Sequence, residues 1–282
     1  CRSLIVAHEL GQVLMAEGDE IHSWLARAIQ HMKTTATYNV FYGEARDHYD
    51  EWGRTAHEAI FNRTNGAFRC VNSQQGFSGL TTWTRGLSWA MLGFSEQLEY
   101  LACCDEQDLE IMGGKEALIR QFLRAATATC DWYIANTSLD GIPLWDSGAP
   151  DASQLGEYRA VPADPWNDWE PFDSSAAAIG AQGLLRLGNF LGKHSSAGKR
   201  YWHAGLTVAQ TLLGDAYLSH DETHQGLLLH SVYHRPRGWD YIPPGRKIPC
   251  GESSMWGDYH IRELMIYLRA ELNGGVPFRF FL

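Results

Sequence analysis

A chain of 282 residues with 45% hydrophobic composition is long enough to bury a sizeable core without a metal ion or disulfides, and we expect one domain over residues 1–282. Its formal net charge of −10 argues against a general binder of nucleic acids or membrane surfaces, because both partners favour a basic face. No stretch reaches the roughly 20 apolar residues of a membrane span.

Apolar periodicity predicts seven helices in chain order, at residues 3–16, 20–35, 82–101, 115–136, 174–191, 197–218 and 254–272. Convincing strand patterns are almost absent. Short runs at 38–42, 66–71 and 226–234 are candidates for small sheets in the connections. The pattern therefore indicates an all-α array.

The connections between these helices alternate in length. Residues 16–20 and 192–196 are short links, whereas 38–81, 141–172 and 219–253 are long, aromatic and rich in Gly, Pro, Asp and Trp. Long loops in compact domains are usually functional. Each long loop leads into a helix, so we expect all three loops at one end of a helical toroid, with helix hairpins repeating about every 80 residues.

Three of the predicted helices begin with hydroxyl-bearing or acidic residues that suit helix capping. These starts are T-T-W-T-R-G-L-S-W from Thr81, D-S-S-A-A-A-I from Asp173 and G-E-S-S-M-W-G-D-Y-H from Gly251. Two of them carry side chains that a cap does not need, namely Trp83, Arg85 and Trp89 in the first and Trp256, Asp258 and His260 in the third. This surplus predicts that the three helix starts face a common pocket.

At this point the sequence resembles a known family. The segments T-T-W-T-R-G-L-S-W-A-M-L-G-F, L-W-D, D-S-S-A-A-A-I-G-A-Q-G-L-L-R-L, V-Y-H-R and M-W-G-D-Y-H are similar to those of the unsaturated glucuronyl hydrolases, glycoside hydrolase family 88, in the same order. The resemblance covers about residues 4–268. It implies an (α/α)6 barrel of twelve helices, of which about seven would lie in this chain as the later part of the barrel.

The resemblance also implies a reaction. The family hydrates the ring double bond of an unsaturated uronic acid at the non-reducing end of lyase-derived oligosaccharides, after which the ring opens and the glycosidic bond breaks. An aspartate acts as general acid and base through water, which requires a carboxyl group within reach of the water and of the carbon. That aspartate would begin the helix that starts here at Cys1 and Arg2, yet no acidic residue precedes Glu9.

The resemblance further implies that Gln75, Arg85, Trp89 and His234 bind the substrate. We add Asn39, at the position of a family histidine, and Trp256, from the third helix start, to the predicted binding residues. Arg85 would pair with the uronate carboxylate, Trp89 would stack on the sugar and Gln75 would fix a hydroxyl or the water. Asn39 stands where the family has a histidine, so the substrate subtype is open. The catalytic acid is unknown; Asp146 and Asp173 are the fallback candidates.

Simpler interpretations exist for the same residues. Arg85 can pair with Asp146 or Asp173 in a structural network. Tryptophans on helices are more often core than sugar platforms. Asp173 is most economically a helix cap.

Two other functions stay open. A sugar epimerase or isomerase on a similar toroid would use His230, His234 and His260 as acid and base. A sugar-binding remnant without the catalytic aspartate would bind uronates and turn nothing over. For the hydrolase the expected partners are unsaturated uronic-acid oligosaccharides, whereas an epimerase would act on saturated sugars. The sequence predicts neither a metal site nor a cofactor and leaves the oligomeric state open.

The six cysteines show no metal-ligand spacing. Cys103 and Cys104 lie inside a helical pattern, which favours buried, reduced thiols and a reducing compartment. Residues 1–10 have no signal-peptide pattern and read like the middle of a helix. We therefore expect a cytoplasmic protein; a signal sequence ahead of Cys1 would instead make it periplasmic or secreted.

Overall fold

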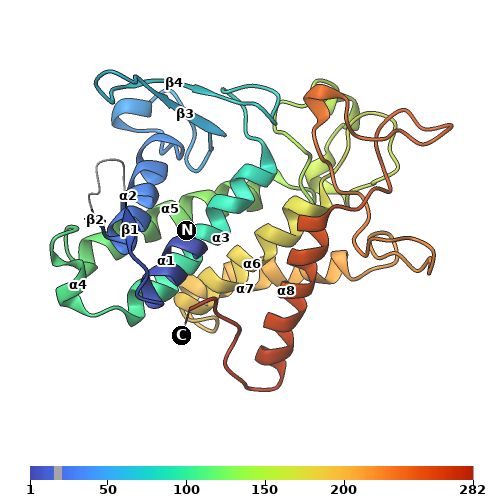
Figure 1. The fold of residues 1–282 in the computed structure, drawn as a ribbon. Coiled ribbons are helices and arrows are strands. Elements are labelled where there is room, and N and C mark those ends of the chain that lie inside the picture. Colours follow the sequence, from blue (N-terminus) through green and yellow to red (C-terminus); the bar gives the residue numbers. More distant parts are fainter. Residues whose placement is uncertain (16–20, 282) are drawn as a thin grey trace.

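The computed structural model describes residues 1–15 and 21–281. In that part the chain forms eight α-helices and two small antiparallel sheets (Figure 1). The helices are Arg2–Glu9 (α1), Trp24–Tyr38 (α2), Thr84–Cys103 (α3), Glu106–Glu110 (α4), Lys115–Asn136 (α5), Ser174–Phe190 (α6), Ser196–Leu212 (α7) and Met255–Leu272 (α8). The strands are Leu14–Met15 (β1), Ile21–His22 (β2), Glu58–Phe61 (β3) and Phe68–Asn72 (β4), which pair as β1 with β2 and β3 with β4.

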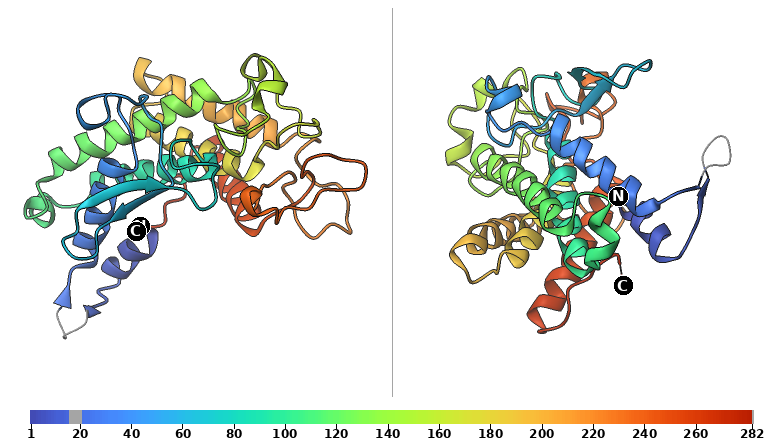
Figure 2. Two further views of the ribbon diagram at one scale, coloured as in Figure 1. Left: turned by 90° about the horizontal axis from the view of Figure 1, so that it is seen from above. Right: turned by 90° about the vertical axis from the view of Figure 1, so that its left-hand side faces the viewer.

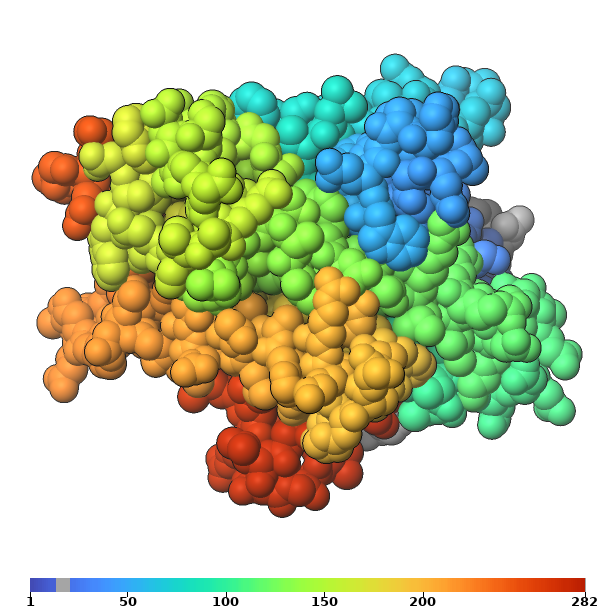
Figure 3. Space-filling view, turned by 180° about the vertical axis from the view of Figure 1, so that it is seen from behind, coloured from blue at the N-terminus to red at the C-terminus, as the bar shows by residue number. Residues whose placement is uncertain are grey.

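The helices pack as hairpins in two layers. α6 lies against α3, α7 and α8, while α3 also packs on α5 and α1 packs on α2. Seen from above, α5 and α7 run along one side, with α3 and α6 inside them (Figure 2). The view from behind shows this outer face, covered by α5 in green and α7 in orange (Figure 3). In these elements α3 and α6 form the inner layer, and α5 and α7 form the outer layer.

Capping fixes where several helices begin. Ser23, Asp173, Ser195 and Ser254 each accept a hydrogen bond from a backbone amide in the first turn of α2, α6, α7 and α8, respectively. These bonds satisfy amides that have no partner inside the helix. The starts of α3, α6 and α8 lie at the end that carries β3, β4 and the long loops (Figure 1). The predicted gathering of the long loops at one end is therefore confirmed.

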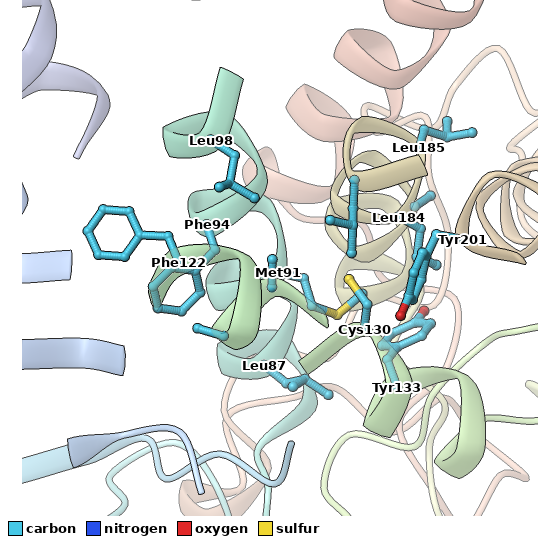
Figure 4. Packing of buried hydrophobic residues seen from close by; sticks show 14 of the residues in the cluster. Leu87, Met91, Phe94, Leu98, Phe122, Cys130, Tyr133, Leu184, Leu185 and Tyr201 are labelled. Carbon is cyan, nitrogen blue, oxygen red and sulfur yellow. The ribbon is translucent and has the colours of Figure 1, made fainter. Parts of the chain in front are cut away.

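The core is built around α6, in which every residue from 174 to 188 is buried. In Figure 4, Leu184 of α6 lies between Met91 of α3 and Tyr201 of α7, with Cys130 and Tyr133 of α5 below. Small residues let the backbones approach closely: a Cβ added at Gly183 would lie 2.8 Å from the backbone of α3, and one at Gly188 would lie 2.7 Å from the backbone of α7. The close approach of three helices therefore depends on glycine.

Several predicted boundaries were wrong. The helix predicted at 3–16 ends at Glu9, because Gly11 adopts φ +63° and the chain turns. The helix predicted at 20–35 begins at Trp24 and runs on to Tyr38. Residues 16 and 20 of these predictions lie outside the described residues. The helix predicted at 197–218 stops at Leu212, and Glu106–Glu110 adds a short helix.

The strand predictions were only partly right. The run 66–71 corresponds to β4, whose partner β3 was not predicted. The run 38–42 is not a strand, because Tyr38 still belongs to α2 and Val40 makes one isolated bridge to Thr55. The run 226–234 is not a strand either, because His230 has φ +68° and breaks any extended pairing. The helical character of the described chain is confirmed.

The cysteine prediction needs a correction. Cys130 and Cys250 are buried, but Cys1, Cys70 and Cys103 are exposed, and no disulfide joins cysteines in the described residues. Among the helices of residues 1–15 and 21–281, none combines the length and apolar character needed to cross a membrane.

Candidate functional site

The first turns of α3, α6 and α8 meet, whereas the predicted pocket shared by all three is not formed, because no residue of α6 lines the pocket described below. Arg85 Nη1 of α3 lies 3.3 Å from Oδ2 of Asp173, the cap of α6. The indole Nε1 of Trp256 in α8 donates to Ser175 Oγ of α6 at 3.0 Å. Three helix starts, far apart in the sequence, therefore share one polar floor.

Arg85 lies in the middle of this floor and is 3% exposed. Its guanidinium carbon is 4.8 Å from the Trp83 ring and 4.7 Å from the Trp256 ring. Its Nη2 donates to Gln75 Oε1 at 3.2 Å and to the Tyr233 carbonyl at 2.8 Å, and its Nη1 donates to the Val232 carbonyl. Both terminal nitrogens of Arg85 thus donate to acceptors of the protein. This geometry agrees with the simpler interpretation from the sequence, in which Arg85 pairs with Asp173 in a structural network.

Burial acts against both charges of this ion pair. It lowers the pKa of Arg85 and raises the pKa of Asp173, while each charge opposes the shift of the other. The Asp173 carboxylate also accepts the backbone amides of Ser175 and Ala176 and the Ser175 hydroxyl. Asp173 is therefore a helix cap and the counter-ion of Arg85.

Asp146, the other fallback acid, is 0% exposed. Its carboxylate accepts the backbone amides of Phe77 at 2.9 Å and Gly148 at 2.8 Å, and burial raises its pKa. Neither Asp146 nor Asp173 lines the pocket described next. A catalytic role for either stays a prediction.

A pocket of about 540 Å³ opens beside the floor, between α1, α2, α3 and α8. Trp89 of α3 and His260 of α8 form one part of its wall, with ring centroids 4.9 Å apart and ring planes at 71°. Trp89 is 39% exposed, which leaves indole surface free for a ligand. This volume suits a small oligosaccharide, since ligand pockets commonly measure about 300–1,000 Å³.

Asn39 and His57 lie on another part of the pocket wall. Asn39 Nδ2 donates to the carbonyls of Ala56 at 3.1 Å and of His57 at 3.4 Å. The His57 ring packs on Trp83 at 4.5 Å, and burial lowers the pKa of His57. Sequence reasoning missed His57; its place in the long loop 38–81, just ahead of β3, was the available signal.

The predicted binding residues therefore divide into two groups. Asn39 and Trp89 line the pocket, whereas Gln75, Arg85 and Trp256 form the floor. His234 is 4% exposed and its backbone amide donates to Asp240 Oδ2 at 3.0 Å. It belongs to neither group, although its neighbour Tyr233 contacts Arg85.

Of the three histidines that an epimerase would use, His260 lines the pocket and His230 and His234 do not. His230 is 3% exposed, and burial lowers its pKa to about 4. The pairing of two pocket histidines that this alternative needs is not formed by these three residues.

The carboxyl group that lines the pocket within the described residues is Glu96, and it is paired. Arg2 Nη2 lies 2.5 Å from Glu96 Oε1. Residues 1–15 and 21–281 contain no group of three or more His, Cys, Asp or Glu side chains arranged to hold a metal ion. The pocket wall thus offers aromatic surface, imidazoles and amides, together with one neutralised carboxylate.

No protein-family model matches the chain. Among curated proteins, it is 26% identical to the unsaturated glucuronyl hydrolase of Bacillus sp. (strain GL1) over 219 residues, 77% of this chain and 47% of that protein. It is 26% identical to the unsaturated glucuronyl hydrolase of Formosa agariphila over 250 residues, 88% and 49%, respectively. It is 24% identical to the unsaturated chondroitin disaccharide hydrolase of Streptococcus pyogenes over 238 residues, 83% and 49%. The chain spans about half the length of these relatives.

Solved structures show the same fold. The chain matches the unsaturated glucuronyl hydrolase of Bacillus sp. GL1 with a TM-score of 0.62 and 22% identity, over 89% of this chain and 52% of the other. It matches an unsaturated glucuronyl hydrolase specific for heparin with a TM-score of 0.63 and 20% identity, over 92% and 56%. The fold is therefore all-α, of the α/α toroid type.

Proposed function

We propose that this chain, which belongs to the family of unsaturated glucuronyl hydrolases, carries the sugar-binding wall of a glycoside hydrolase that acts on unsaturated uronic-acid oligosaccharides. The reaction would hydrate the ring double bond of the terminal uronic acid, so that the ring opens and the glycosidic bond breaks.

One observation carries the proposal: the half-exposed indole of Trp89 lies in a pocket of about 540 Å³ beside His260, His57 and Asn39. An aromatic face next to a few polar groups is the usual composition of a pocket that orients a small ligand. The amide and imidazole groups suit sugar hydroxyls, because each can donate or accept a hydrogen bond.

The positions of the carboxyl groups favour a second candidate function, a protein that binds uronates without catalysis. Hydration needs a carboxyl group near the water and the carbon that receives the proton. Glu96 is paired with Arg2, while Asp146 and Asp173 are buried and do not line the pocket. The residues of the pocket wall would then bind the uronate without catalysing its hydration.

The test is to incubate the 282-residue chain with unsaturated chondroitin, heparin and hyaluronan disaccharides and to follow the ultraviolet absorbance of the conjugated double bond. Loss of absorbance supports hydration, and Asp146→Asn and Asp173→Asn would then test the fallback acids. Binding without loss favours the second candidate. Absence of binding contradicts both candidates, and activity on saturated sugars would favour an epimerase.

A further inference from the structure

His260 is a pocket residue that the predicted binding set leaves out. It lies in the second turn of α8, lines the pocket and is 4% exposed. Its ring meets the Trp89 ring edge to face, with centroids 4.9 Å apart. A sugar that stacks on Trp89 therefore has the His260 imidazole at its rim.

The buried side chain of Gln182 in α6 fixes the orientation of this imidazole. Gln182 Nε2 lies 2.9 Å from His260 Nδ1 and 3.0 Å from the His260 carbonyl oxygen. An amide NH₂ has two hydrogens, so it can donate to both atoms, and Nδ1 then accepts. The proton of the neutral ring is thereby assigned to Nε2.

Protonation of the ring leaves this arrangement at Nε2 unchanged. Glu263 Oε2 lies 3.5 Å from Nδ1 and would face the second proton of an imidazolium. Nε2 therefore carries a hydrogen in both charge states. The hydrogen bonds of the ring to the described residues all end at Nδ1, so Nε2 is the donor left for a ligand in the pocket.

Arg2 keeps the nearby carboxylates from repelling an anion. It donates to both oxygens of Glu263, each at 2.8 Å, and to both oxygens of Glu96, at 3.0 and 2.5 Å. Arg186 Nε also lies 3.8 Å from Glu96 Oε1. Two guanidinium groups therefore face the two carboxylates beside His260.

Arg85 is not available for this task in the observed geometry. Its terminal nitrogens are engaged by Asp173, Gln75 and backbone carbonyls, and it does not line the pocket. A carboxylate on an sp² ring carbon lies near the plane of the sugar ring. It points outward from the rim of a sugar stacked on Trp89, so that a sugar turned with this edge towards α8 brings its carboxylate to His260.

We infer that His260 Nε2 donates a hydrogen bond to the carboxylate of the uronic acid bound in the pocket, and so selects acidic over neutral sugars. This role rests on the proposed sugar-binding function and assigns recognition of the uronate carboxylate to His260. Gln182 and Glu263 are positioning residues for it, since they act through the imidazole.

The experiment compares binding of an unsaturated uronyl disaccharide and of its methyl ester by isothermal titration calorimetry. His260→Asn keeps an amide near Nδ1 but removes the Nε2 donor, whereas His260→Gln can place an amide N–H near the Nε2 position. We expect His260→Asn to weaken binding of the acid about 10- to 100-fold, the range of a hydrogen bond to a charged group, and binding of the ester less than about threefold. His260→Gln should retain most of the preference. His203→Asn, at an exposed histidine of α7, is the control.

Equal losses for acid and ester in His260→Asn would show a packing role under Trp89 and overturn the inference. Unchanged affinity for the acid would overturn it as well, provided that far-ultraviolet circular dichroism shows a folded variant. Failure of the proposed hydrolysis is a separate result: the wild type would prefer acid over ester while the double-bond absorbance stays constant. If the wild type binds neither sugar, both the inference and the proposed function fail.

Discussion

Glu263 forms ion pairs with two residues of the pocket wall, Arg2 and His260. Burial raises the pKa of the Glu263 carboxyl, but the neighbouring His260 ring and the Arg2 guanidinium outweigh burial and lower the pKa to about 2. The ordinary value is 4.5. Because the folded-state pKa lies below the unfolded value, the charged carboxylate stabilises the fold above about pH 4.5, and this contribution is lost as pH falls towards 2.

Glu263→Gln should therefore lower the free energy of unfolding at pH 6, and its difference from wild type should shrink as pH falls from about 4.5 to about 2. Urea denaturation at a series of pH values measures this. Glu110→Gln, at an exposed position of α4, should show no such trend. A difference between wild type and Glu263→Gln that is independent of pH would contradict the ion-pair account.

At this scale the sequence predicted residue types better than their roles. It predicted that Arg85, Asp173 and Trp256 lie near one another, because capping residues and tryptophans at helix starts can be recognised in a sequence. It could not show that Arg85 would be enclosed by protein acceptors, since backbone carbonyls such as that of Tyr233 leave no trace in composition. His57 was missed because its placement depends on how a loop folds back.

The central helix α6 makes its contacts through small residues. At Gly183 an added Cβ would lie 2.8 Å from the backbone N of Leu92 and the backbone C of Met91 in α3. Backbone atoms of a packed helix cannot move aside as a flexible side chain can. By contrast, a Cβ at Gly93 of α3 would meet nothing within 4 Å.

Gly183→Ala should destabilise the fold by about 1–3 kcal/mol, because overpacking forces α3 and α6 apart. Gly93→Ala is the matched control and should stabilise it by up to about 1 kcal/mol, the difference in helix propensity. Chemical denaturation of both variants measures these changes. Equal effects of the two substitutions would contradict the close packing of α3 and α6.

Helix interiors were predictable and helix ends were not. Amphipathic periodicity located every long helix, because burial of one face dominates the pattern. The end of α1 depends on Gly11 at φ +63°. The periodicity of apolar residues does not predict such a backbone conformation. α2 runs past Thr35 to Tyr38, with the Thr35 and Thr37 hydroxyls bonded to carbonyls of the preceding turn. The pairing of β3 with β4 is set by a loop, which periodicity does not describe.

The whole molecule leaves part of α8 uncovered. Met255 is 85% exposed, Tyr259 52% and Ile266 57%, and with Phe278 they line a hollow of about 530 Å³. The charged residues Asp258, Arg262 and Glu263 also line it. Exposed apolar surface among charged side chains usually marks an interaction site or a tendency to associate. One face of α8 is thus a candidate surface for association.

The isolated chain should therefore self-associate as its concentration rises. Ile266→Lys should reduce this association, because a charge in the hollow must be desolvated when the surface is covered. Leu139→Lys, at an exposed apolar residue outside the hollow, should have little effect. Sedimentation velocity distinguishes the cases. A wild-type chain that stays monomeric at all concentrations would contradict this prediction.

The central claim is that the pocket beside Trp89 binds an unsaturated uronyl sugar. The most direct measurement is calorimetric titration of an unsaturated uronyl disaccharide into wild type, Trp89→Ala and Trp169→Ala. Trp169 is the matched control, since it is 42% exposed, close to the 39% of Trp89, and lies outside the pocket. We predict 1:1 binding by the wild type, a loss of about 30-fold or more in Trp89→Ala, as for a buried tryptophan anchor, and less than about threefold in Trp169→Ala. Absence of binding by the wild type, or equal losses in the two variants, would contradict the account.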